Sequence, residues 1–130
     1  MSIEESAEVL RRLFKAFSDR DARTLAELVA EDAVWRIGGR SPVAGEYRGR
    51  EEIFRLFRLT GELTGRSYRT ELRYALGDGY RAVAVYRAVG DRDARRLDIE
   101  QVLLCRVIGG QLRKVDAVPT DQYAFDEFWS

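Results

Sequence analysis

The apolar residues of this chain change their spacing near position 66, and this change limits the folds that the chain can adopt. Before that point, apolar side chains return every three or four positions, as at Leu10, Leu13 and Phe17, which is typical of a helix with one buried face. Beyond it, they alternate with polar side chains, as in half-buried strands. A helical first half followed by a sheet-forming second half predicts an α+β fold.

Turn and capping residues divide the two halves into elements. The sequence predicts helices over residues 3–18, 22–29 and 50–63, a loop over residues 38–49, and strands over residues 33–37, 67–76, 80–89, 95–108 and 111–118. Glycine-rich turns join the later strands, so these should form an antiparallel meander, and a last short helix follows a cap at Thr120 or Asp121. We expect a cone-shaped, curved antiparallel sheet packed on three helices, with a short C-terminal helix and an apolar cavity inside the cone.

Composition excludes several classes of function. The 130 residues suit a single domain, and 22 basic against 22 acidic residues argue against a general nucleic-acid binder. The chain has no histidine, so it cannot form a histidine-based triad or a zinc site with histidine ligands. Its one cysteine, Cys105, allows no internal disulfide, and no apolar run reaches the roughly 20 residues of a membrane span. With an acidic start unlike a signal peptide, we expect a cytoplasmic protein that needs no metal or cofactor and binds neither nucleic acid nor membrane.

Two polar residues are predicted to face the cavity from the strands. Tyr86 shares one face with Ala84 and Ala88, which leaves room beside its phenol. That phenol could donate a hydrogen bond to a ligand oxygen, or it could be an ordinary core tyrosine. Gln101 shares its face with Leu103, and an amide in an apolar row needs a hydrogen-bond partner, which a ligand or water can provide.

Five larger apolar side chains are candidates for the cavity wall. Trp35 and Ile37 share one face of the first strand, while Phe17, Phe54 and Phe57 follow helical spacing. Such a stripe usually forms a core. In a cone of this kind the core also lines the pocket, so both interpretations apply to the same residues.

One carboxylate, Asp121, has two interpretations. Near an apolar cavity the pKa of a carboxyl group rises, which suits proton transfer around neutral pH. Alternatively, Asp121 caps the last helix by accepting a hydrogen bond from a backbone amide. The two roles are compatible with each other.

Four segments carry a family resemblance, namely residues 30–35 (AEDAVW), 39–50 (GRSPVAGEYRGR), 106–112 (RVIGGQL) and 121–129 (DQYAFDEFW). Through them the chain resembles the SnoaL-like proteins of the nuclear-transport-factor-2-like superfamily, which includes ketosteroid isomerase and limonene epoxide hydrolase. The resemblance implies a cone-shaped α+β fold and a homodimer formed through the sheet. Members of this superfamily include isomerases, cyclases, hydrolases and proteins without catalysis, so the function must be argued from the site.

The catalytic positions of these relatives can be compared with this sequence. The resemblance places the base of ketosteroid isomerase at Ile37, and the carboxylates of limonene epoxide hydrolase at Tyr86 and Ala117, so those acids are missing. In SnoaL polyketide cyclases an aspartate near the start of the C-terminal segment acts as acid and base with the help of a histidine. Asp121 matches the aspartate, and no residue matches the histidine.

These observations predict a protein that binds a small hydrophobic or cyclic organic molecule. If it is an enzyme, we expect a cofactor-independent isomerase or cyclase that moves a proton next to a carbonyl, with Asp121 as acid or base and Tyr86 as the oxyanion donor. The alternative is a non-catalytic ligand carrier or a dimerisation and partner-binding module. The predicted ligand contacts are Phe17, Trp35, Ile37, Phe54, Phe57, Gln101 and Leu103.

Overall fold

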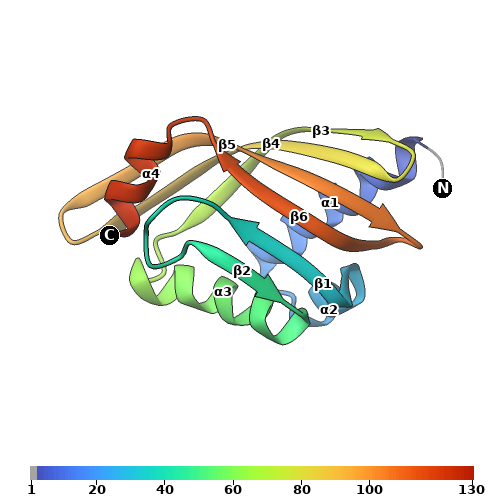
Figure 1. Cartoon of the computed structure of the whole chain (residues 1–130), viewed down its shortest axis with the longest axis horizontal. Coiled ribbons are helices and arrows are strands. Elements are labelled where there is room, and N and C mark those ends of the chain that lie inside the picture. The colour runs from blue at the N-terminus through green and yellow to red at the C-terminus, as the bar shows by residue number, and fades with distance from the viewer. Residues whose placement is uncertain (1–2) are drawn as a thin grey trace.

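The structure, a computed structural model, describes residues 3–130 as helices packed on one mixed sheet (Figure 1). The helices are α1 (Ile3–Asp19), α2 (Ala22–Leu28), α3 (Arg50–Leu63) and α4 (Gln122–Trp129). The strands are β1 (Val29–Ile37), β2 (Gly45–Arg48), β3 (Arg69–Asp78), β4 (Arg81–Arg92), β5 (Arg95–Ile108) and β6 (Gln111–Pro119). The predicted α+β class and the short C-terminal helix are confirmed.

The helices form where the sequence supplies an apolar stripe and a cap. α1 buries Leu10 and Leu13 against the sheet, whose strands β3 and β4 it contacts. Asp21 caps α2, and its carboxylate accepts a hydrogen bond from the Thr24 amide at 3.1 Å. α3 buries Ile53 on the face that it turns toward β1 and β2.

The sheet has the strand order β2-β1-β6-β5-β4-β3 and does not close, since β2 and β3 lie at its two ends. The four strands of the meander pair antiparallel, as predicted. β1 and β6 pair parallel, with Trp35 opposite Val115, so the sheet is mixed and not antiparallel throughout. Alternation along a strand shows which side chains face inward, but it carries no information on the direction of the neighbouring strand.

Two details of the first strands differ from the prediction. β2 lies inside the segment that was predicted as a loop. The prediction missed this strand because four residues are too few to show an alternating pattern. Its Tyr47 pairs with Trp35 and donates a hydrogen bond from its hydroxyl to the carbonyl of Val43 at 2.7 Å. β1 begins at Val29, earlier than expected, and a register shift between Val29 and Val34 interrupts its alternation.

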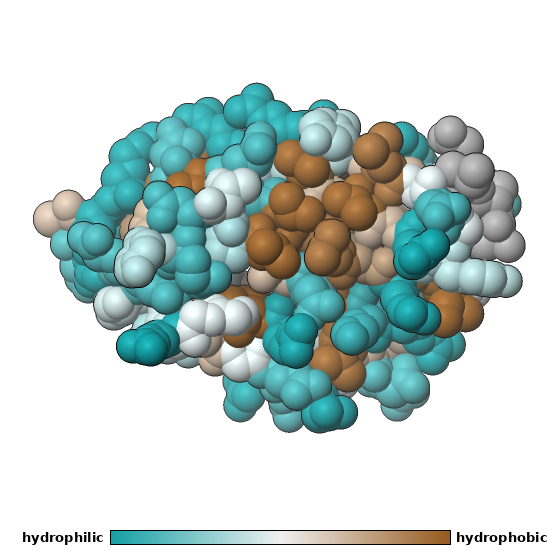
Figure 2. Space-filling model, turned by 45° about the horizontal axis from the view of Figure 1, so that its top comes forward, coloured by the Kyte–Doolittle hydropathy of each residue, from teal (hydrophilic) through white to brown (hydrophobic). Residues whose placement is uncertain are grey.

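The sheet has two different faces. Its concave face carries core residues such as Ala84 and Leu103 and is covered by helices. On its other face, apolar side chains from four strands form two cross-strand rows, visible as a brown area near the middle of Figure 2. This outer apolar face consists of Leu76, Val83 and Leu104 in one row and Tyr74, Val85, Val102 and Val118 in the other. Within residues 3–130, no helix is long and apolar enough to cross a membrane.

Candidate functional site

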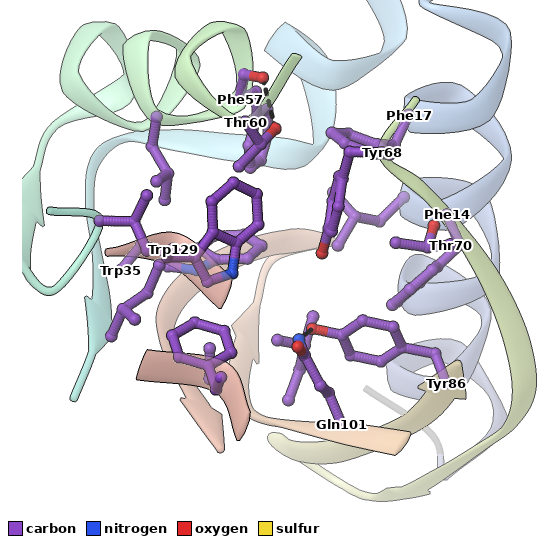
Figure 3. Close-up of a pocket in the computed structure, with 17 residues that line it drawn as sticks. Phe14, Phe17, Trp35, Phe57, Thr60, Tyr68, Thr70, Tyr86, Gln101 and Trp129 are labelled. Carbon is purple, nitrogen blue, oxygen red and sulfur yellow. Dashed lines mark hydrogen bonds between the residues drawn. The ribbon is translucent and has the colours of Figure 1, made fainter. Parts of the chain in front are cut away.

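An apolar cavity of about 80 Å³ lies inside the cone, between the concave face of the sheet and helices α1, α3 and α4 (Figure 3). One water needs only about 10–15 Å³ of such space, whereas drug-sized ligands occupy sites of roughly 300–1,000 Å³. The cavity therefore suits a small molecule. It brings together seven of the nine predicted site residues, namely Phe17, Trp35, Ile37, Phe57, Tyr86, Gln101 and Leu103.

A hydrogen-bonded pair of side chains lies on the sheet side of the cavity. Tyr86 on β4 pairs with Gln101 on β5 in the sheet register, which places both side chains on the concave face. The amide nitrogen Nε2 of Gln101 donates to the Tyr86 hydroxyl at 2.7 Å. The hydroxyl of Tyr68, just before β3, also interacts with Gln101, so this amide connects two phenols.

Both phenols are protonated at neutral pH. Burial raises the pKa of Tyr86 well above its ordinary value of 10, and the hydrogen bond from Gln101 offsets only part of that rise. Burial raises the pKa of Tyr68 in the same way. Each hydroxyl is therefore a hydrogen-bond donor and acceptor near neutrality, not a base.

Three polar atoms of the cavity wall have no hydrogen-bond partner among the described residues. They are Oε1 of Gln101, Oγ1 of Thr70 and the indole Nε1 of Trp129. Gln101 is 3% exposed and Trp129 is 1% exposed, so both side chains are buried within the fold. A buried polar group without a partner costs about 1–3 kcal/mol, which makes these atoms the natural contacts for whatever fills the cavity.

Aromatic rings form the helical side of the wall. Phe57 on α3 packs edge-on against Trp35, with ring centroids 5.2 Å apart, and against Phe17 at 5.3 Å. Phe54 lies behind this layer, stacked on Phe57 at 6.1 Å, and does not line the cavity. One helical turn separates residues 54 and 57, so the stripe that predicted both as ligand contacts could not show which one faces inward.

Asp121 also lies outside the cavity lining. Its side chain is exposed and caps α4, accepting a hydrogen bond from the Ala124 amide at 3.0 Å. The geometry therefore supports the capping interpretation, and it does not bring this carboxylate together with Tyr86.

Sequence reasoning missed several lining residues, of which Tyr68, Thr70 and Trp129 are the polar ones with a role at the site. Alternation would have found Thr70, because it pairs with Ala88 on the concave face. Nothing in the sequence shows that α4 folds back over the cone, and this placement is what brings Trp129 into the cavity.

The described lining residues carry no carboxylate, ammonium or guanidinium group. The cavity therefore offers neutral hydrogen-bond donors and acceptors on an apolar background. Such a set can hold a ligand and polarise a carbonyl, but it contains no general base. No group of three side chains suited to a metal ion occurs within residues 3–130.

Comparison with known proteins identifies the family. A model of the SnoaL-like domain matches residues 10–115 of the chain. The structure of Bal32a, from a soil-derived mobile gene cassette, is 35% identical in sequence and superimposes with a TM-score of 0.95 over 98% of both chains.

More distant structures share the architecture. An NTF2-like protein of Burkholderia xenovorans LB400 is 22% identical, with a TM-score of 0.86 over 100% of this chain and 99% of its own. IdmH of Streptomyces antibioticus, a candidate polyketide cyclase, is 20% identical, with a TM-score of 0.73 over 90% of this chain and 92% of its own. At this level of identity the likeness shows the fold alone. Since the family model spans most of the sequence, the chain belongs to the SnoaL-like domain family and has an NTF2-like fold.

Proposed function

We propose that this protein binds a small, uncharged, cyclic organic molecule in the cavity of its cone. The observation that carries the proposal is the combination of an apolar wall with the buried Tyr86–Gln101 hydrogen bond. A few well-placed polar groups in an otherwise apolar cavity are the usual features of a small-molecule site.

The absence of charged groups in the described lining favours an uncharged ligand. A charged ligand would lose its hydration on entry and find no side chain of opposite charge to compensate. The volume of about 80 Å³ argues against a large polycyclic molecule. The rings of Phe17, Trp35 and Phe57 offer apolar surface to a flat ligand.

The same lining limits the chemistry that the protein could perform on a bound ligand. Tyr86 and Tyr68 can donate hydrogen bonds to a carbonyl oxygen, but they do not take up a proton at neutral pH. An isomerase or cyclase that depends on a general base would need Asp121, which lies outside the lining. Binding of a neutral ring is therefore the function best supported, and the naming of IdmH as a candidate polyketide cyclase fits a cyclic organic ligand.

A set of three probes of similar size and different charge tests this proposal. We expect acetophenone to raise the thermal midpoint of the pure protein at pH 7, whereas benzoate and benzylammonium should leave it unchanged. A ligand at 100 times its dissociation constant adds about 2.7 kcal/mol to the stability, which shifts the midpoint by several degrees. Equal shifts with all three probes, or no shift with acetophenone, would contradict the proposal.

A matched pair of variants places the ligand in the cavity. Tyr86→Phe removes one hydroxyl from the wall, and we expect it to weaken acetophenone binding about five- to tenfold in isothermal titration. Tyr123→Phe makes the same chemical change at a side chain that is 91% exposed and should leave the affinity unchanged. An equal effect of both substitutions would show that acetophenone binds elsewhere.

A further inference from the structure

The Tyr86–Gln101 pair offers a ligand one donor and one acceptor side by side. The Tyr86 oxygen accepts from Nε2 of Gln101, so its own proton remains available to a ligand. Oε1 of Gln101 has no partner among the described residues and remains available as an acceptor. Rotating the amide by half a turn exchanges the two roles but leaves the same combination of one donor and one acceptor.

A second donor faces the cavity from α4. The indole Nε1 of Trp129 can only donate, and it has no partner within the described part of the chain. Figure 3 shows this nitrogen and the hydroxyl of Tyr68 both pointing into the cavity that the Gln101 amide borders. Gln101 and Trp129 line the cavity and are each more than nine-tenths buried, so a partner for these atoms must come from inside the fold.

We propose that the ligand is a flat, uncharged ring with a hydrogen-bond donor directly beside a carbonyl, as in a cyclic amide. The N–H of such a ring would donate to Oε1 of Gln101, and its carbonyl would accept from the hydroxyl of Tyr86. Nε1 of Trp129 would donate a second hydrogen bond to the same carbonyl oxygen, which has two lone pairs. This assignment rests on the proposed binding of a neutral ring and adds the polar pattern that the ring must carry.

Three matched probes test the pattern. 2-Pyridone has the N–H beside the carbonyl, N-methyl-2-pyridone keeps only the carbonyl, and toluene has neither group. We expect 2-pyridone to bind the wild-type protein about tenfold more tightly than each of the other two in isothermal titration at pH 7. Only 2-pyridone can both donate to Oε1 of Gln101 and accept from Nε1 of Trp129.

Substitution of Trp129 tests the second donor. Trp129→Phe removes the N–H and keeps an aromatic ring; it should weaken 2-pyridone binding about fivefold more than it weakens toluene binding. If this variant does not fold, the three-probe comparison on the wild-type protein still decides the question.

The outcomes separate this inference from the proposed function. Equal affinities for all three probes would overturn the donor–acceptor pattern while leaving neutral-ring binding intact. Binding by none of them, together with no response to acetophenone, would overturn both. A tighter complex with 2-pyridone alone would support the pattern and name the class of compound to search for the natural ligand.

Discussion

At the scale of single residues, burial changes the chemistry of the two cavity tyrosines most directly. Tyr68 and Tyr86 lie in an apolar environment, which disfavours the charged phenolate and raises the pKa of each hydroxyl above 10. In the unfolded chain both hydroxyls return to their ordinary pKa. The difference between the two states links the stability of the fold to pH.

We therefore expect the free energy of unfolding to fall as the pH rises above 10. Below pH 10 both states keep the Tyr86 proton, so this residue adds no pH dependence; above it only the unfolded state releases the proton, which favours unfolding. The loss approaches about 1.4 kcal/mol per pH unit for one such tyrosine. Urea unfolding between pH 8 and pH 11 should show a shallower decline in Tyr86→Phe than in the wild-type protein, and identical declines would contradict the raised pKa.

At the scale of elements, α4 closes the cavity and depends on contacts at both of its ends. Asp121 caps its first turn, and the carboxylate of Asp126 accepts a hydrogen bond from the Arg40 amide at 3.2 Å, which connects α4 to the loop between β1 and β2. At its other end, Arg92 donates to the carbonyl of Phe128 at 3.3 Å. These contacts hold Trp129 in the wall of the cavity.

The cap gives a prediction that separates a structural role of Asp121 from a catalytic one. Asp121→Ala should lower the free energy of unfolding by about 1 kcal/mol, because the Ala124 amide loses its acceptor. Asp121→Asn keeps an acceptor at the same place and should cost much less. Chemical denaturation measures both effects. Loss of ligand binding in Asp121→Asn, with the stability retained, would show that the carboxylate acts at the site.

The elements also show how far the sequence could predict this fold. Long patterns identified α1, α3 and the meander, and a cap at Thr120 or Asp121 identified α4, since these signals lie within one element. The parallel pairing of β1 with β6 and the position of Trp129 in the cavity depend on contacts between distant elements. For the same reason, the alternation around Tyr86 and Gln101 predicted their shared face correctly, while the placement of Asp121 relative to them needed the structure.

At the scale of the whole molecule, the outer apolar face is the main surface without a partner in the described chain. Its exposed members include Leu76, Leu104 and Val118. Figure 2 shows a brown, apolar area near the middle of this view. Ion pairs lie along its flanks, with Arg87 joined to Asp98 at 2.7 Å on one side. An apolar centre with a charged rim is typical of a surface that another protein covers.

We expect a second copy of this chain to cover the outer apolar face, as the family resemblance implies, because a two-fold axis would pack its two apolar rows against the same rows of the partner. Light scattering after size exclusion should give twice the chain mass of 14.9 kDa for the wild-type protein. Leu104→Glu would place an uncompensated carboxylate from each copy in the interface, and should shift the mass to that of one chain. Tyr123→Glu adds the same charge at an exposed side chain of α4, outside the outer apolar face, and should leave the dimer intact. A wild-type protein that elutes as a single chain at all concentrations, or a Leu104→Glu variant that remains dimeric, would contradict an interface on this face.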